Sequence, residues 1–208
     1  MVIGGSTFLV TGGGSGLGAA VGRALLELGA NVAFADIDLK GAQAEAAHHA
    51  ERGFAVRVDV TDGESVEEAV TAVTTRFGPL RGVVNCAGIA PAQRIVGREG
   101  PHSLELFAKV VSVNLIGTFN AMRIAAAAMV GNELDAHGER GVIINTASAA
   151  AFDGQIGQAA YAASKGGVVS LTLPAARELG RHAIRVVTIA PGIFERSEEH
   201  TSELQSRP

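Results

Sequence analysis

The sequence has little of what marks an exported, disulfide-bonded or membrane-spanning protein. Cysteine occurs once among 208 residues, as Cys86, so no internal disulfide can form, which agrees with a reducing compartment. The N-terminus has no basic region followed by an apolar core, and apolar runs are short and broken by glycine or charge. Neither a secretory signal nor a spanning helix is therefore predicted. We expect a cytoplasmic location, or the mitochondrial matrix if the chain is eukaryotic.

A preponderance of one charge is also lacking. The 17 lysines and arginines are scattered against 21 acidic residues, and no basic stripe is interleaved with aromatics, so nucleic-acid binding is not predicted. The six histidines, including His48-His49, show no ligand spacing, so no metal site is predicted. Cys86 follows an apolar run, and we interpret it as a small packed residue rather than a nucleophile.

What the sequence does have is an alternation of short β-branched or apolar runs with helical patterns. This alternation, together with 47% hydrophobic residues, predicts one α/β domain. Because crossovers between parallel strands are right-handed, the domain should be a doubly wound parallel sheet of Rossmann type with helices on both faces. The predicted strands are residues 7–10, 31–35, 55–60, 82–85, 142–146 and 185–189. The predicted helices are residues 17–28, 41–52, 65–76, 104–129 and 159–179, and the polar stretch 132–140 is predicted as a surface loop.

A glycine-rich segment, TGGGSGLG, lies directly after the first predicted strand and opens the first predicted helix. There, backbone N–H groups and the helix dipole can hold a pyrophosphate. A G-x-G-x-x-A pattern fits residues 14–19, and a wider G-x-x-x-G-x-G pattern fits residues 12–18; we prefer the wider one because it starts at the strand end. A purely structural glycine turn is the alternative. The residues expected to contact a dinucleotide are Gly12, Ser15, Gly16, Leu17 and Gly18.

The second predicted strand is followed by Asp36, placed so that its carboxylate can accept hydrogen bonds from an adenosine ribose. The same charge would repel a 2′-phosphate, and no arginine replaces Ser15 or Ile37 to attract one. The sequence therefore favours NAD over NADP. A solvated strand end is the alternative interpretation of Asp36.

A hydroxyl, a phenol and an ammonium are placed where they can converge. Tyr161 and Lys165 are four residues apart, so on a helix they share one face. A tyrosine ordinarily keeps its proton up to about pH 10, and a fixed positive charge nearby favours the phenolate. Ser148 ends a run that is predicted as a buried strand, where an open α/β sheet presents its ligands. Together these residues predict an enzyme, although the Tyr-x-x-x-Lys spacing alone is common in ordinary helices.

Taken together, these motifs resemble the short-chain dehydrogenase/reductase family, in order along almost the whole chain. Asp59-Val60 matches the pair that contacts adenine, Asn85-Cys-Ala-Gly88 the element under the cofactor, and Pro191-Gly192 the turn beside the nicotinamide. Asn114, in Ser-Val-Asn-Leu, matches the asparagine of the family's fourth helix. The resemblance implies a catalytic group of Asn114, Ser148, Tyr161 and Lys165. Beyond the glycine loop and Asp36, it implies cofactor contacts from Asp59, Val60, Asn85, Ala87, Gly88, Tyr161, Lys165, Pro191 and Gly192.

Within the family, several segments look closest to type-2 3-hydroxyacyl-CoA dehydrogenases, which oxidise the 3-hydroxyl of acyl-CoA chains with NAD. The resemblance implies that Tyr161 takes the hydroxyl proton, that Lys165 supports it and holds the nicotinamide ribose, and that Ser148 donates to the substrate oxygen. Asn114 would anchor a water, or simply occupy a helix kink. Gln158 would contact the thioester carbonyl, or simply start a helix. The rival functions are a 3-oxoacyl-thioester reductase, which Asp36 disfavours, and a non-catalytic nucleotide-binding scaffold.

The chain departs from the family pattern after Pro191-Gly192. The family continues with a substrate-covering loop and helix and a further strand, whereas residues 195–208 are polar, show no strand pattern and resemble a translated sequencing-adapter tail. We therefore expect an NAD-binding domain over residues 1–194, incomplete at its C-terminus, and a non-native disordered tail over residues 195–208. The strand ending at Ile189 would then be an exposed apolar edge. The resemblance also implies a homotetramer at full length.

Overall fold

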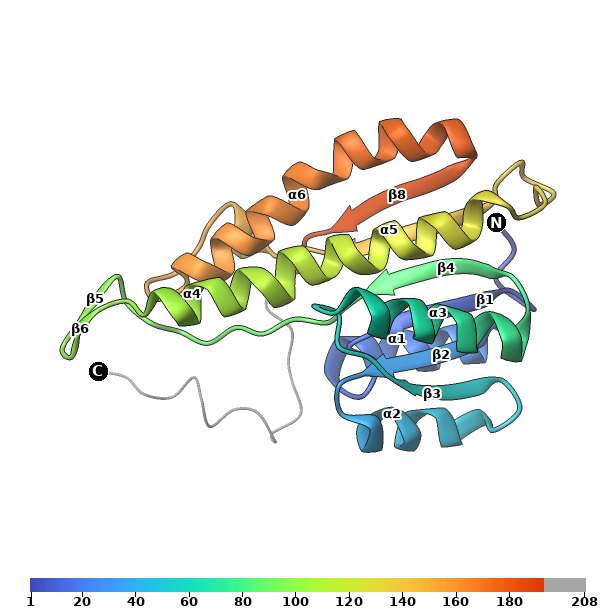
Figure 1. Cartoon of the computed structure of the whole chain (residues 1–208), viewed down its shortest axis with the longest axis horizontal. Helices are drawn as coiled ribbons and strands as arrows, with labels where there is room; N and C mark the ends of the chain where they lie inside the picture. The colour runs from blue at the N-terminus through green and yellow to red at the C-terminus, as the bar shows by residue number, and fades with distance from the viewer. Residues whose placement is uncertain (193–208) are drawn as a thin grey trace.

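A six-stranded parallel sheet forms the centre of the molecule (Figure 1). The computed structural model describes residues 1–192, so the predicted tail lies outside the described residues. The strands are β1 (Thr7–Thr11), β2 (Asn31–Asp36), β3 (Gly53–Arg57), β4 (Leu80–Asn85), β7 (Gly141–Thr146) and β8 (Ile184–Ile189). Their order, β3-β2-β1-β4-β7-β8, reverses between β1 and β4. This confirms the predicted doubly wound sheet, and its switch point is where such sheets bind ligands.

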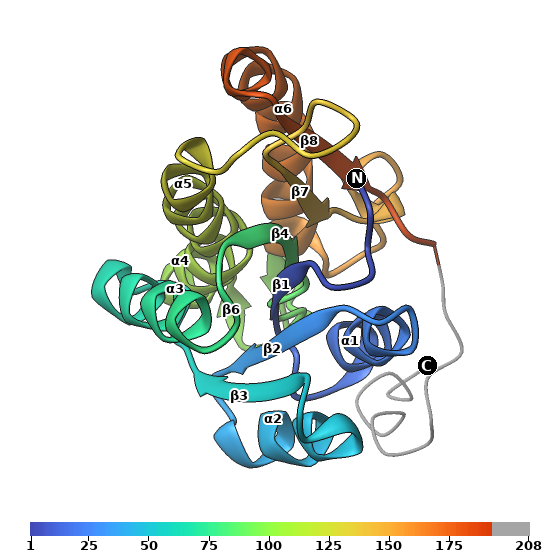
Figure 2. The ribbon, with the colours of Figure 1, turned by 90° about the vertical axis from the view of Figure 1, so that its right-hand side faces the viewer.

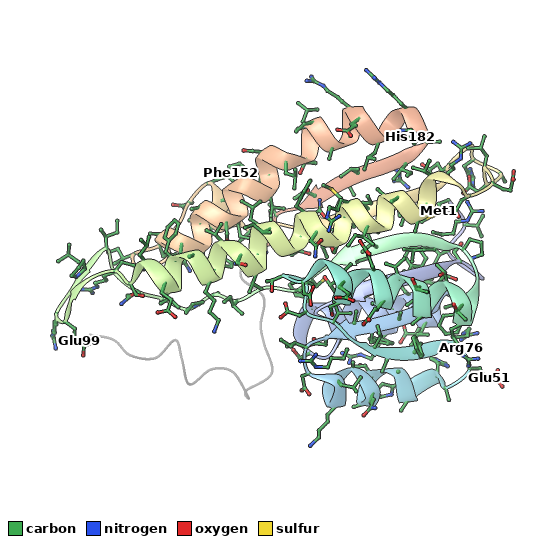
Figure 3. All side chains as sticks on the ribbon, viewed as in Figure 1. Met1, Glu51, Arg76, Glu99, Phe152 and His182 are labelled. Atoms are coloured by element: carbon green, nitrogen blue, oxygen red, sulfur yellow. The ribbon has the colours of Figure 1, made fainter. Side chains whose placement is uncertain are left out.

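Helices cover both faces of the sheet (Figure 2). On one face lie α1 (Gly16–Glu27) and α2 (Leu39–Ala46). On the other lie α3 (Gly63–Phe77), α4 (Leu104–Val111), α5 (Gly117–Val130) and α6 (Ala159–Leu179). Short 3-10 helices span Ala47–His49, Ala149–Ala151 and Gly180–His182. A small hairpin of β5 (Val96–Gly97) and β6 (Gly100–Pro101) projects from the α4 end of the molecule, with Glu99 at its tip (Figure 3).

The apolar strand runs follow from burial on both sides. Successive residues of β1 point to opposite faces of the sheet: Phe8 and Val10 pack in the cluster that includes Leu26 of α1, whereas Leu9 packs in the cluster that includes Val66 of α3. All five residues of β1 are buried. A parallel sheet covered on both faces therefore reads as continuous hydrophobic sequence rather than as an alternating pattern.

Several predicted boundaries differ from the observed ones by two or more residues, and two of them have a clear local cause. The strand predicted over residues 55–60 ends at Arg57, because Asp59 turns the chain: its carboxylate accepts hydrogen bonds from the backbone N–H (2.9 Å) and hydroxyl (2.7 Å) of Thr61. The helix predicted over residues 41–52 runs instead over α2. It starts earlier because Asp38 accepts a hydrogen bond from the N–H of Lys40 (3.1 Å) and so caps it. Polar side chains that bond nearby backbone thus account for these two boundaries, whereas α2 also ends at Ala46, where the 3-10 helix Ala47–His49 follows.

The helix predicted over residues 104–129 forms as one uninterrupted rod. Its middle part, η2 (Ser112–Ile116), is π-helical and joins α4 to α5. By length and composition alone, Leu104–Val130 is long and apolar enough to cross a membrane. Some 56% of its most apolar window is buried inside the protein. Because Ala121, Ala125 and Met129 lie in the main core cluster, this is the core helix of the domain.

Candidate active site

The glycine loop between β1 and α1 packs more closely than any other residue type would allow. Gly12 adopts a left-handed φ of +66°, and a Cβ there would lie 2.7 Å from the backbone nitrogen of Ala87. A Cβ on Gly18 would lie 2.1 Å from the carbonyl oxygen of Gly12. Gly16, in contrast, has a φ of +53° and faces open space. In the wider glycine spacing, Gly12 and Gly18 are therefore required by close backbone contacts and Gly16 by its positive φ.

This loop suits an anionic ligand. Because α1 begins at Gly16, the N–H groups of Gly16, Leu17 and Gly18 have no acceptor within the helix. The first turn of α1 carries no acidic residue. Free N–H groups at a helix N-terminus beside a glycine turn are the arrangement that holds a pyrophosphate. The residues present therefore fit a dinucleotide.

Asp36 ends β2 beside this loop. One carboxylate oxygen accepts a hydrogen bond from the N–H of Gly14 (2.9 Å) and the other from the N–H of Asp38 (2.9 Å). A Cβ on Gly14 would lie 3.0 Å from the carboxylate, so only glycine leaves this approach open. The carboxylate is thus held in a fixed orientation next to the glycine loop.

Asp59 and Val60 follow β3 and lie in the turn before α3. Hydrogen bonds from Thr61 lower the pKa of the Asp59 carboxyl below its ordinary value, so it is ionised at neutral pH. Val60 is buried, and its carbonyl accepts a hydrogen bond from the side chain of Asn120 (2.9 Å). The pair predicted near adenine is therefore held by α5 and by its own turn.

Asn85 belongs to a buried row of polar side chains that crosses three strands. Its amide donates to the side-chain oxygen of Asn145 (2.9 Å), and the hydroxyl of Thr11 donates to its side-chain oxygen (3.4 Å). The Thr11 hydroxyl in turn accepts from the N–H of Ala87 (3.3 Å). The row fixes the segment leading to Gly88. The sequence analysis gave Thr11 and Asn145 no role, although each is a polar residue at or next to the C-terminal end of a buried apolar strand.

Lys165 and Tyr161 lie on one face of α6, as predicted. The Lys165 ammonium lies 5.8 Å from the centroid of the Tyr161 ring and donates a hydrogen bond to the carbonyl of Thr146 (2.6 Å). Lys165 is only 4% exposed, and this burial lowers its pKa from 10.5 to about 8. A buried ammonium beside a half-buried phenol is thus anchored to the end of β7.

Ser148 starts the 3-10 helix that follows β7. Its hydroxyl oxygen accepts a hydrogen bond from the N–H of Ala150 (3.1 Å), which leaves the hydroxyl proton able to donate to a substrate. Backbone bonds from Ala147 to Ile189 and from Ala149 to Pro191, each 2.8 Å, hold this turn against the end of β8. They bring Pro191-Gly192 beside Ser148.

Asn114 lies in the π-helical segment and is fully buried. Its side chain accepts from the N–H of Ile89 (2.8 Å), and donates to the carbonyl of Ile89 (2.9 Å) and to the hydroxyl of Ser164 on α6 (3.0 Å). A Cβ on Gly88 would lie 3.2 Å from the Asn114 side-chain oxygen and 3.7 Å from the Lys165 nitrogen. Asn114 therefore joins the segment after β4 to the helix that carries Tyr161 and Lys165.

Cys86 is partly buried against the cluster under α1 and α2. Burial raises the pKa of its thiol above the ordinary value. A protonated thiol packed in an apolar cluster agrees with the interpretation of Cys86 as a packing residue.

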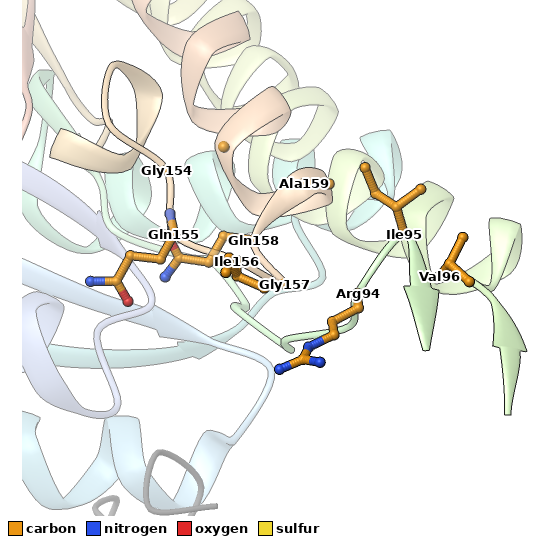
Figure 4. Close-up of a pocket in the computed structure, with 10 residues that line it drawn as sticks. Arg94, Ile95, Val96, Gly154, Gln155, Ile156, Gly157, Gln158 and Ala159 are labelled. Carbon is orange, nitrogen blue, oxygen red and sulfur yellow. Dashed lines mark hydrogen bonds between the residues drawn. The ribbon is translucent and has the colours of Figure 1, made fainter. Parts of the chain in front are cut away.

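A hollow of about 400 Å³ lies beside the first turn of α6 (Figure 4). Gln158 lines it, and its side-chain oxygen accepts a hydrogen bond from the N–H of Gln155 (3.0 Å). The other wall, formed by Arg94, Ile95 and Val96, was missed by the sequence analysis, because aliphatic residues in a loop carry no periodic signal. The hollow adds a substrate-sized space one turn from Tyr161.

The pKa of Lys165 predicts how stability changes with pH. Because the folded pKa is lowered, the unfolded chain binds more protons between pH 8 and 10.5, so this group raises the unfolding free energy as pH increases through that window. From pH 8 to 9.5 we expect a gain of about 1.5 kcal/mol. Urea denaturation of the wild type and of Lys165→Met at each pH measures it as a difference. Parallel pH profiles for the two proteins would contradict the burial of a charged Lys165.

The sheet order, the glycine loop opening α1 and the polar strand ends define a Rossmann-type dinucleotide-binding fold. The model of the short chain dehydrogenase family matches residues 6–207. The chain belongs to this family, which implies NAD or NADP as cofactor.

Individual relatives narrow the comparison. The chain is 48% identical over 188 residues to 3-hydroxyacyl-CoA dehydrogenase type-2 of Bos taurus, and equally to that of Homo sapiens, covering 89% of this chain and 72% of each relative. The crystal structure of 3-hydroxyacyl-CoA dehydrogenase type-2 from Mycobacterium avium superposes with a TM-score of 0.85 at 42% identity, covering 90% of this chain and 74% of that one. The chain is thus similar to this subgroup over nearly all its length, and shorter than its members.

Proposed function

We propose that the chain oxidises the 3-hydroxyl group of 3-hydroxyacyl-CoA substrates with NAD. The observation that carries this proposal is the convergence at one end of the sheet of the buried Lys165 ammonium, the Tyr161 ring and the Ser148 turn. The similarity to relatives named for this activity supports the choice of substrate.

Each of the three side chains has a distinct task in this proposal. The deprotonated phenol oxygen of Tyr161, whose ring lies 5.8 Å from the Lys165 ammonium, takes the proton of the substrate hydroxyl. The Ser148 hydroxyl donates to the same substrate oxygen and stabilises the charge that develops there. When bound, the nicotinamide ring supplies the hydride acceptor. Lys165 would also hold the nicotinamide ribose.

The contacts of Asn114 suggest a positioning role. Its side-chain amide donates hydrogen bonds to Ile89 and Ser164. Its backbone carbonyl accepts a hydrogen bond from the hydroxyl of Thr118 (2.7 Å). We propose that it sets the distance between α6 and the segment after β4. The water predicted at Asn114 stays a prediction.

The proposed cofactor is NAD rather than NADP. The Asp36 carboxylate, fixed by Gly14 and Asp38, can accept the hydrogen bonds of a ribose diol and would repel a 2′-phosphate. The exposed Ile37 next to it offers no positive charge. The glycine loop would hold the pyrophosphate, and Asp59, Val60, Asn85, Ala87, Gly88, Pro191 and Gly192 complete the proposed contacts.

The function is tested by following NADH formation from 3-hydroxybutyryl-CoA, with NAD and NADP compared side by side. We expect turnover with NAD and a kcat/KM at least about tenfold lower with NADP, since a carboxylate facing a phosphate loses affinity on this scale. A preference for NADPH and 3-oxoacyl thioesters would instead support the reductase. NAD binding without any turnover would support the nucleotide-binding scaffold.

Three further predictions remain proposals. A homotetramer and a cytoplasmic location follow from the family resemblance and the composition. The division into a domain over residues 1–194 and a non-native tail over residues 195–208 rests on sequence pattern alone.

A further inference from the structure

The hollow beside α6 is apolar on one side to an unusual degree. Ile95, Val96 and Ile156 line it and are 70%, 75% and 84% exposed. Exposed aliphatic side chains around one hollow are typical of a surface that a ligand or partner covers. The first turn of α6 contributes Ala159 and Ala162 to the same hollow, so the hollow borders the helix that carries Tyr161.

Among the residues of the described part of the chain that line the hollow, Arg94 is the one charged side chain. It leaves the loop in the direction opposite to Ile95 and Val96, so that the guanidinium and these two side chains occupy different ends, with Ile156 beside Gln158 on the facing wall (Figure 4). Across residues 1–192, none of the ion pairs involves Arg94. The hollow therefore has an apolar end and a cationic end, and no acid within the described residues 1–192 forms an ion pair with that cation.

The loop that carries Arg94 is held in place from both sides. The N–H of Gln93 donates to the carbonyl of Gly157 (2.9 Å) on the opposite wall. The side-chain oxygen of Gln93 accepts from the N–H of Ser103 (3.0 Å), which caps α4. Gln93 thereby links the two walls of the hollow and fixes the backbone next to Arg94, which reduces the entropy lost when the guanidinium binds a ligand.

Resting on the proposed function, we propose that Arg94 is a specificity residue that binds a phosphate group of coenzyme A while the aliphatic end of the hollow takes the acyl chain. An acyl-CoA has the same two-ended character as the hollow. A guanidinium matches the geometry of phosphate oxygens and can form paired charge-assisted hydrogen bonds with them. Because the chain carries a net charge of −4, a local cation also offsets its repulsion of an anionic substrate.

The test separates the phosphates from the rest of the ligand. Acetoacetyl-CoA and acetoacetyl-pantetheine share the acyl group and the thioester arm, and only the first carries the nucleotide phosphates. Both are titrated calorimetrically into the NAD complex, where the oxidised ligand and oxidised cofactor cannot react. For Arg94→Gln we expect affinity for the CoA thioester to fall about tenfold and affinity for the pantetheine thioester to change less than about twofold.

Arg98→Gln is the matched control, because Arg98 lies between β5 and β6, four residues after Arg94, is exposed and does not line the hollow. It should leave both affinities unchanged, and added salt should weaken the CoA thioester more in the wild type than in Arg94→Gln. Equal effects of Arg94→Gln on both ligands, or equal wild-type affinity for them, would overturn the role of Arg94 while leaving the dehydrogenase proposal standing. If the wild type binds NAD but neither thioester, the acyl-CoA function itself fails.

Discussion

Replacing Tyr161 with phenylalanine is expected to lower kcat for 3-hydroxybutyryl-CoA oxidation about a thousandfold. The substitution removes one oxygen atom and keeps the ring, which lies 5.8 Å from the Lys165 ammonium. General-base catalysis by a positioned side chain contributes about 10²- to 10⁴-fold, and the whole of this contribution depends here on the phenol oxygen. Initial rates of NADH formation at saturating NAD measure the loss.

The control for this variant is Ser170→Ala, which removes an exposed hydroxyl from the same helix and should change kcat by less than about twofold. NAD affinity of Tyr161→Phe should remain within about threefold of the wild type, because the ring and Lys165 are retained. A kcat within tenfold of the wild type would mean that another group takes the proton, and the mechanism would have to be abandoned.

Gly18→Ala is expected to disrupt the cofactor site and lower the unfolding free energy by about 3 kcal/mol. The new methyl group would lie 2.1 Å from the carbonyl oxygen of Gly12, which is backbone and cannot swing away as a side chain would. Relief requires α1 to move off the loop, and that movement separates the N–H groups at the start of α1 from the turn at Gly12. Urea denaturation and NAD titration measure the two effects.

Gly180→Ala serves as the matched control, since Gly180 has helical dihedral angles (φ −57°, ψ −30°) and a Cβ there meets nothing within 4 Å. It should be neutral or stabilising by up to about 1 kcal/mol. If both alanine variants behaved alike, the effect at Gly18 would come from helix propensity rather than from the clash, and the packing argument for the loop would be wrong.

The doubly wound sheet and the alternation of strands and helices could be predicted because burial on both faces leaves a continuous apolar pattern in each strand. Two of the boundary errors lie where polar side chains compete with that pattern. Asp59 ends β3 three residues early by bonding Thr61, and Asp38 starts α2 two residues early by capping it. Local hydrogen bonds of this kind are specific to a conformation, so composition and periodicity do not reveal them.

The site divides in the same way. The Tyr161 and Lys165 pair could be predicted because helical spacing fixes their relation. The contacts that hold it in place could not: the Lys165 bond to the carbonyl of Thr146 and the bond between Asn114 and Ser164 join segments distant in sequence. The roles of Gln93 and Arg94 could not be predicted from the sequence for a further reason. They lie in a loop, which has no helical or strand periodicity from which the direction of a side chain can be derived.

The π-helical segment between α4 and α5 has a consequence for insertions and deletions. Each residue of an α-helix turns the chain by about 100°. The wider turn at Ser112–Ile116 therefore sets how the side chains of α5 are rotated about the helix axis relative to those of α4. Deleting one residue there would restore a regular helix but rotate Ala121, Ala125 and Met129 out of the core. The number of residues in this segment is therefore constrained as well as their identity, because it sets how α4 and α5 are rotated relative to each other. Asn114, which lies in this segment, fixes it against α6 through its hydrogen bond to Ser164.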